Sequence, residues 1–72
     1  MAISDEQVHQ FAQKVATCGF EEVAYKAVRI LEKDPDYGKI RALKIVTDNV
    51  PSNVKQGNEL RDEAAKMLGI LR

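Results

Sequence analysis

Cations and tyrosines in the middle of the chain carry most of its capacity for binding chemistry. A guanidinium or ammonium group can bind a phosphate or a carboxylate, and tyrosine and arginine are enriched in protein interfaces. Five residues of these two kinds are candidates for contact with a partner: Tyr25, Arg29, Tyr37, Arg41 and Lys44. The alternative interpretation is an ordinary solvated surface, because acidic residues are interspersed among the five. These acidic residues are Glu21, Glu22, Glu32 and Asp48.

Residues that could act as a nucleophile, a base or a metal ligand are few. The chain has one cysteine, Cys18, and one histidine, His9, so it cannot form a zinc site of the usual cysteine and histidine kind. Cys18 falls on an apolar helical stripe with no base placed beside it, whereas a catalytic thiol needs a base and a polarising environment. We therefore expect no enzyme activity, no metal site and no cofactor.

Length and composition narrow the class of protein. The chain has 72 residues, and we expect a single helical domain over residues 1–72. Eleven acidic and eleven basic residues cancel, which does not favour binding to nucleic acid or to an anionic membrane. No apolar run approaches the roughly 18 residues of a membrane span, and the first residues do not have the pattern of a secretory signal. A lone cysteine suits a reducing compartment, so we expect a cytoplasmic protein.

Hydrophobic periodicity predicts the first two elements. Apolar side chains recur at helical spacing in the first quarter of the chain, and Ser4 followed by Gln7 has the pattern of a capping box. Gly19 is a residue type that commonly stops a helix. Helical spacing then resumes at once. The sequence therefore predicts helices over about 5–18 and about 20–33, joined by a very short connection.

Two more helices are expected in the second half. Asp34 can cap a helix that has Pro35 in its first position, and the apolar spacing then predicts a helix over about 35–48. A loop of asparagine, proline and serine residues separates it from a fourth helix over about 54–68. Gly69 is expected to end that helix.

The end of the fourth predicted helix resembles the first helix of a helix-turn-helix motif, in which Leu-Gly-Ile leads through a tight turn into a recognition helix. The resemblance covers Arg61 to Ile70. It would imply DNA reading by a helix after the turn, but the chain ends at Arg72. A glycine that stops an alanine-rich helix accounts for the same residues.

The third predicted helix contains the most apolar run of the chain, from Ile40 to Val46. Its apolar arc covers well over half of the helical wheel, which indicates contact with more than one neighbour. A narrow polar strip remains, and it consists of Tyr37, Arg41, Lys44 and Asp48. The sequence therefore predicts an all-α fold, a compact bundle of four short helices with the third helix central. Because the core is small and lacks a disulfide, we also expect a homo-oligomer.

Two functional hypotheses follow from these patterns. The first is a small non-enzymatic protein-interaction module, an adaptor, regulator or inhibitor that occupies a surface of a macromolecular partner through the five cationic and tyrosine residues. The second is a nucleic-acid- or nucleotide-binding helical protein that uses a basic face on the second and third helices. We favour a protein partner because the chain is neutral and because tyrosine beside arginine is typical of protein interfaces. Salt separates the two hypotheses, since binding to phosphates weakens steeply as salt increases.

Overall fold

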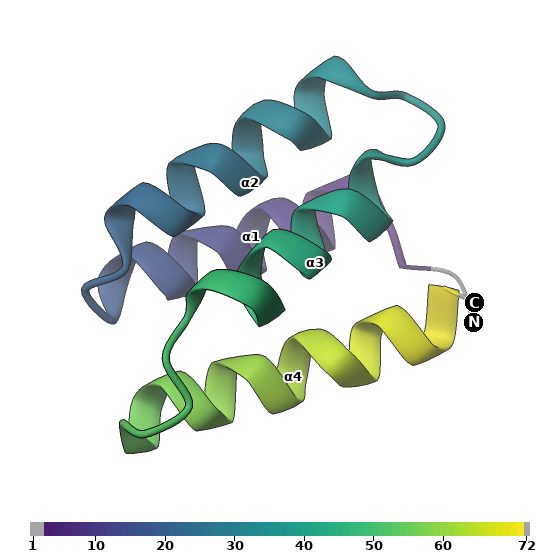
Figure 1. Ribbon diagram of the computed structural model, residues 1–72. Coiled ribbons are helices and arrows are strands. Elements are labelled where there is room, and N and C mark those ends of the chain that lie inside the picture. Colours follow the sequence, from purple (N-terminus) through teal and green to yellow (C-terminus); the bar gives the residue numbers. More distant parts are fainter. Residues whose placement is uncertain (1–2, 72) are drawn as a thin grey trace.

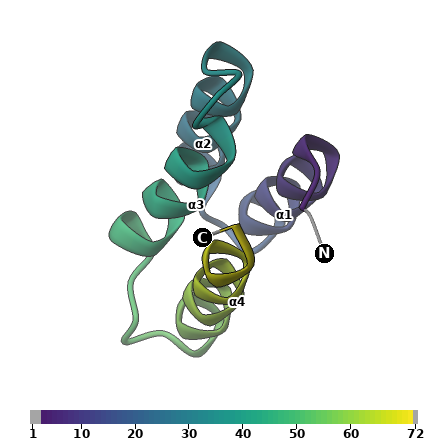
Figure 2. The ribbon, with the colours of Figure 1, turned by 90° about the vertical axis from the view of Figure 1, so that its right-hand side faces the viewer.

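The computed structural model describes residues 3–71, which form four α-helices joined by short connections. The helices are α1 Asp5–Thr17, α2 Glu21–Lys33, α3 Gly38–Asn49 and α4 Lys55–Leu71. Successive helices run in opposite directions, and α2, α3 and α4 follow one another side by side (Figure 1). Viewed from the end, α1 packs against α2 and also reaches α3 (Figure 2). The predicted all-α fold is confirmed.

The first two helices lie close to their predicted positions. The capping box before α1 is present, since the Ser4 Oγ accepts the Gln7 backbone N–H at 3.2 Å and the Gln7 Oε1 accepts the Ser4 N–H at 2.8 Å. After α1, Gly19 has a φ of 101°, a conformation that a Cβ would strain. The chain therefore turns tightly into α2, and each of the two helices is only one residue shorter than predicted.

The start of α3 differs from the prediction, which placed Pro35 in the first helical position. Asp34 is not the N-cap of α3, because the helix begins at Gly38 and its N-cap is Tyr37. The Asp34 carboxylate instead stabilises the preceding turn, since its Oδ1 accepts the backbone N–H of Tyr37 at 2.9 Å. Gly38 is buried against α2, where a Cβ would lie 2.9 Å from the carbonyl oxygen of Leu31. Helix formation thus begins where glycine allows the chain to pass close to α2.

The connection between α3 and α4 depends on close packing around Gly57. α3 ends at Asn49, one residue beyond the predicted end, and the next residue, Val50, is 2% exposed. Gly57 is buried in the first turn of α4, and a Cβ there would overlap the carbonyl oxygen of Pro51. The preceding loop is therefore the segment that approaches Gly57.

α4 continues past the predicted stop at Gly69 and ends at Leu71. Gly69 keeps a negative φ, in contrast to Gly19. Leu71 lies one helical turn after Leu68 and packs against the core, so burial of a further apolar side chain favours continuation of the helix. The prediction of a stop at Gly69 was wrong, and the described residues do not form the tight turn that a helix-turn-helix motif requires there.

α3 is the centre of the core. It packs against α1, α2 and α4, as its wide apolar arc predicted. Leu43 is 0% exposed and Val46 is 1% exposed, and the hydrophobic cluster around them draws residues from all four helices. The flanking Ile40 and Ile45 are half-buried. The prediction of a four-helix bundle with a central third helix is confirmed.

Candidate interaction surface

Tyr25 and Arg29 form a pair on the outside of α2. They are four residues apart and therefore lie on the same side of the helix. The guanidinium carbon of Arg29 lies 5.6 Å from the centroid of the Tyr25 ring, within the range of a cation–π interaction. Tyr25 is nevertheless 63% exposed. Arg29 therefore restricts the motion of a large amphipathic side chain that stays exposed to solvent. Binding of a partner to Tyr25 would then cost less side-chain conformational entropy.

Tyr37, Arg41 and Lys44 form a second group, in which Arg41 and Lys44 lie on the exposed strip of α3 and Tyr37 lies in the turn directly before it. The Arg41 Nη1 lies 3.1 Å from the Asp34 Oδ2. The backbone N–H of Tyr37 and then the Arg41 guanidinium lower the pKa of the Asp34 carboxyl, because both stabilise its charged form. The charge of Arg41 is therefore partly compensated within the chain. Lys44 makes no ion pair with any residue in the range 3–71, and Tyr37 is 65% exposed.

The five predicted contact residues thus fall into two groups. Tyr25 borders a hollow between α1 and α2, to which α3 contributes no residue. α3 lies against another part of α2, where Gly38 approaches the backbone of Ile30 and Leu31. The described residues show no hydrogen bond or ion pair between the two groups. Whether either group contacts a partner stays a prediction.

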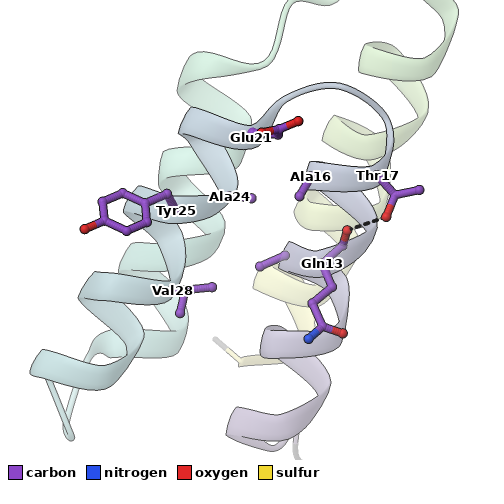
Figure 3. A pocket seen from close by; sticks show the side chains of 8 residues that line it. Gln13, Ala16, Thr17, Glu21, Ala24, Tyr25 and Val28 are labelled. Atoms are coloured by element: carbon purple, nitrogen blue, oxygen red, sulfur yellow. Dashed lines mark hydrogen bonds between the residues drawn. The ribbon is translucent and has the colours of Figure 1, made fainter.

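The hollow between α1 and α2 is floored by small side chains. Ala16 of α1 and Ala24 of α2 face each other across it, and Val28 lies beside them on α2 (Figure 3). Tyr25 lines the edge of the hollow, and its ring projects from α2 away from α1. Because the facing side chains are short, the helices leave about 480 Å³ of open space. Its lining consists of Ala12, Gln13, Ala16, Thr17, Glu21, Ala24, Tyr25 and Val28. The chemistry of the floor is therefore apolar, with polar side chains at the rim.

Most residues that line this hollow lie outside the predicted contact set. A signal for them exists in the sequence, since Ala12 and Ala16 are one turn apart on α1 and Ala24 occupies the facing stripe of α2. Short side chains on the facing stripes of two helices joined by a short turn leave space between those helices. The apolar stripes predicted which faces are buried, but not that this contact would be incompletely filled.

A second hollow lies between the same two helices, toward the start of α1. His9 of this hollow is four residues before Gln13 of the first, and Glu32 is four residues after Val28, so the two hollows follow one another along the helices. The lining of the second hollow is Asp5, Glu6, His9, Leu31, Glu32 and Pro35. The two hollows together are named the α1–α2 groove below.

The chain has one histidine and one cysteine, His9 and Cys18, as candidates for catalysis or metal binding. Residues 3–71 contain no cluster of three or more histidine, cysteine, aspartate or glutamate side chains placed to hold a metal ion. His9 is half-buried in the second hollow, and Cys18 is a half-buried free thiol. None of the described helices combines the length and the apolar character needed to cross a lipid bilayer. The α1–α2 groove combines an apolar floor with the exposed Tyr25 at its edge.

The fold and this groove define a class of structure: four antiparallel helices with an open groove along the first two. Comparison with known protein families, with curated proteins and with solved structures finds no match to this chain.

Proposed function

We propose that this chain is a small non-enzymatic protein-interaction module, an adaptor, regulator or inhibitor that acts by occupying a surface of a protein partner. The observation that carries the proposal is the position of Tyr25, which is 63% exposed, paired with Arg29 and located at an apolar hollow. Binding free energy in protein interfaces concentrates on aromatic and arginine side chains of this kind. Tyr37 in the turn before α3 and Lys44 on α3 offer a second, more polar contact.

Binding of nucleic acid or a nucleotide through the basic residues of α2 and α3 is the alternative function. The charges on the described surface support it less. Arg41 is paired with Asp34, which leaves Lys44 as the unpaired cation of the α3 group. The groove beside Tyr25 is lined by carboxylates, and neither of its two hollows has a lysine or arginine among its described lining residues. A phosphate backbone would be repelled there.

Affinity capture from native cell extract, with and without nuclease, tests the proposal. The wild-type chain is compared with Tyr25→Ala and with Ile70→Ala, which removes a side chain that is 54% exposed on α4. We expect a protein that is retained after nuclease treatment and in high salt by the wild type and by Ile70→Ala. Tyr25→Ala should retain it about tenfold less well, because an exposed aromatic contact is lost.

Three results together would contradict the proposal. Nuclease or high salt would remove the complex, Tyr25→Ala would leave it intact, and Arg41→Glu combined with Lys44→Glu would abolish it. Such behaviour is characteristic of binding through phosphates. Circular dichroism of each variant confirms that the helices are retained, so that a loss of binding reports on the surface.

A further inference from the structure

We infer that the α1–α2 groove binds a cationic amphipathic helix of a protein partner. This inference depends on the proposed interaction function and names the chemistry of the partner. The groove extends along α2 from Glu21 to Glu32. At a rise of 1.5 Å per residue this corresponds to about 16 Å, or roughly three turns of a docked helix.

The walls of the groove favour a helix over an extended segment. Both walls are α-helices, whose backbone N–H and C=O groups are bonded within each helix, so they cannot pair with a strand in the way that the edge of a sheet does. The floor instead offers space between short side chains, since Ala16 and Ala24 face each other across it. A partner helix can place large aliphatic side chains there at positions i, i+3 or i+4, and i+7.

The ends of the groove are acidic. Asp5, Glu6 and Glu32 line one end and Glu21 lines the other, and all four residues are exposed. None of these carboxylates forms an ion pair with a described residue. The cationic Arg29 is placed over the ring of Tyr25 instead. Lysine or arginine residues on either side of an apolar stripe would complement this charge pattern.

Glu32 is the one of these four carboxylates whose position helix stability does not explain. Carboxylates in the first turn stabilise a helix, and this explains Asp5 and Glu6 in α1 and Glu21 in α2. Glu32 lies one residue before the end of α2 at Lys33, where the helix dipole disfavours negative charge. An exposed carboxylate in that position, without an ion pair among the described residues, is consistent with a cation supplied by a partner.

Two synthetic peptides test the inference. Both form amphipathic helices with the same leucine stripe, but one has lysine at its flanking positions and the other has glutamate there. Binding to the full chain is measured by fluorescence anisotropy at low salt. We expect the lysine peptide to bind about tenfold more tightly, because several exposed carboxylates each contribute a modest attraction. The preference should decrease as salt increases.

Variants locate the binding on the groove. Ala16→Arg places bulk and positive charge in its floor, and the matched control Ala65→Arg makes the same change at an exposed alanine of α4. We expect at least about tenfold weaker binding of the lysine peptide for the first variant and unchanged binding for the second. Glu32→Gln, a mild change at an exposed side chain, should reduce the affinity about twofold to fourfold and provides a test that does not depend on the folding of the first variant.

Several outcomes would overturn the inference: equal binding of the two peptides, preference for the glutamate peptide, absence of saturable binding of both, or an equal effect of the two arginine variants. These failures leave the proposed function intact if capture of a protein still depends on Tyr25. Conversely, loss of Tyr25-dependent capture contradicts the proposed function itself. The inference about the groove can therefore be refuted without refuting the proposed function.

Discussion

Alanine in place of Gly57 and alanine in place of Gly69 should change stability in opposite directions, although both glycines lie in α4. Alanine is favoured over glycine in a helix by up to about 1 kcal/mol. At Gly69 an added Cβ meets nothing within 4 Å, so this preference applies directly. Gly69 is close to the helix end, where fraying reduces the benefit, and we expect the free energy of unfolding to rise by about 0.5 kcal/mol.

At Gly57 the added Cβ would overlap the carbonyl oxygen of Pro51, a backbone atom that no change of rotamer can move. The loop must shift, and Val50, which is 2% exposed, would lose part of its packing. Overpacking of this kind costs about 1–3 kcal/mol, which exceeds the gain in helix propensity of at most about 1 kcal/mol. We expect the free energy of unfolding to fall by about 1–2 kcal/mol.

Urea unfolding followed by far-UV circular dichroism measures both changes against the wild type. A loss of about 1–2 kcal/mol is a large share of the roughly 3–5 kcal/mol that a core of this size supplies. Divided by an m-value of about 1–2 kcal/mol per molar urea, it should lower the urea midpoint by about 1 M. An increase in stability for Gly57→Ala, or changes of the same sign in both variants, would refute the packing of the loop against the first turn of α4.

Three further predictions concern the cap, the α2–α3 turn and self-association. Ser4→Ala removes the capping acceptor of α1 and should lower the free energy of unfolding by about 1 kcal/mol in the same urea assay; unchanged stability would contradict the cap. Asp34→Asn should destabilise the chain at neutral pH but not in acid. The lowered pKa of Asp34 in the folded state makes its charged form stabilising above the unfolded-state pKa, and this contribution is lost as the pH falls through the folded-state pKa. The unfolding free energies of wild type and variant should converge in acid, and a pH-independent difference would contradict this. Light scattering at micromolar concentration should detect a homo-oligomer, and a stable, strictly monomeric chain would count against self-association.

The helices could be predicted because the information that specifies them is local. The pairing of Ser4 with Gln7 and the placement of Gly19 after an apolar stripe each involve residues close in sequence. The starting residue of α3 could not be obtained in this way, because it depends on the approach of Gly38 to Leu31 across two helices. Such a contact exists only after the helices have packed.

Gly69 is a second position where the local sequence did not predict the structure. It has the same local appearance as Gly19, namely a glycine after an apolar stripe, yet the helix continues through it. The difference lies in the contact of Leu71 with the core, which is a tertiary interaction. Residue type alone therefore could not distinguish a stop from a continuation.

The candidate surface was predicted in part. Exposure of Tyr25 and Tyr37 followed from their places on the polar faces of predicted helices. The ion pair between Arg41 and Asp34 did not, because it requires the turn that precedes α3. The α1–α2 groove was also not predicted, since it results from the way in which facing alanines such as Ala16 leave space when two helices pack.

The central claim is that a protein partner binds on the α1–α2 groove. An amide-resolved NMR titration of the isotope-labelled chain with the captured partner tests this most directly. We expect the largest shift changes at Ala12, Ala16, Ala24 and Tyr25, with little change along α4. Changes confined to the exposed strip of α3, with the groove residues unaffected, would contradict the claim.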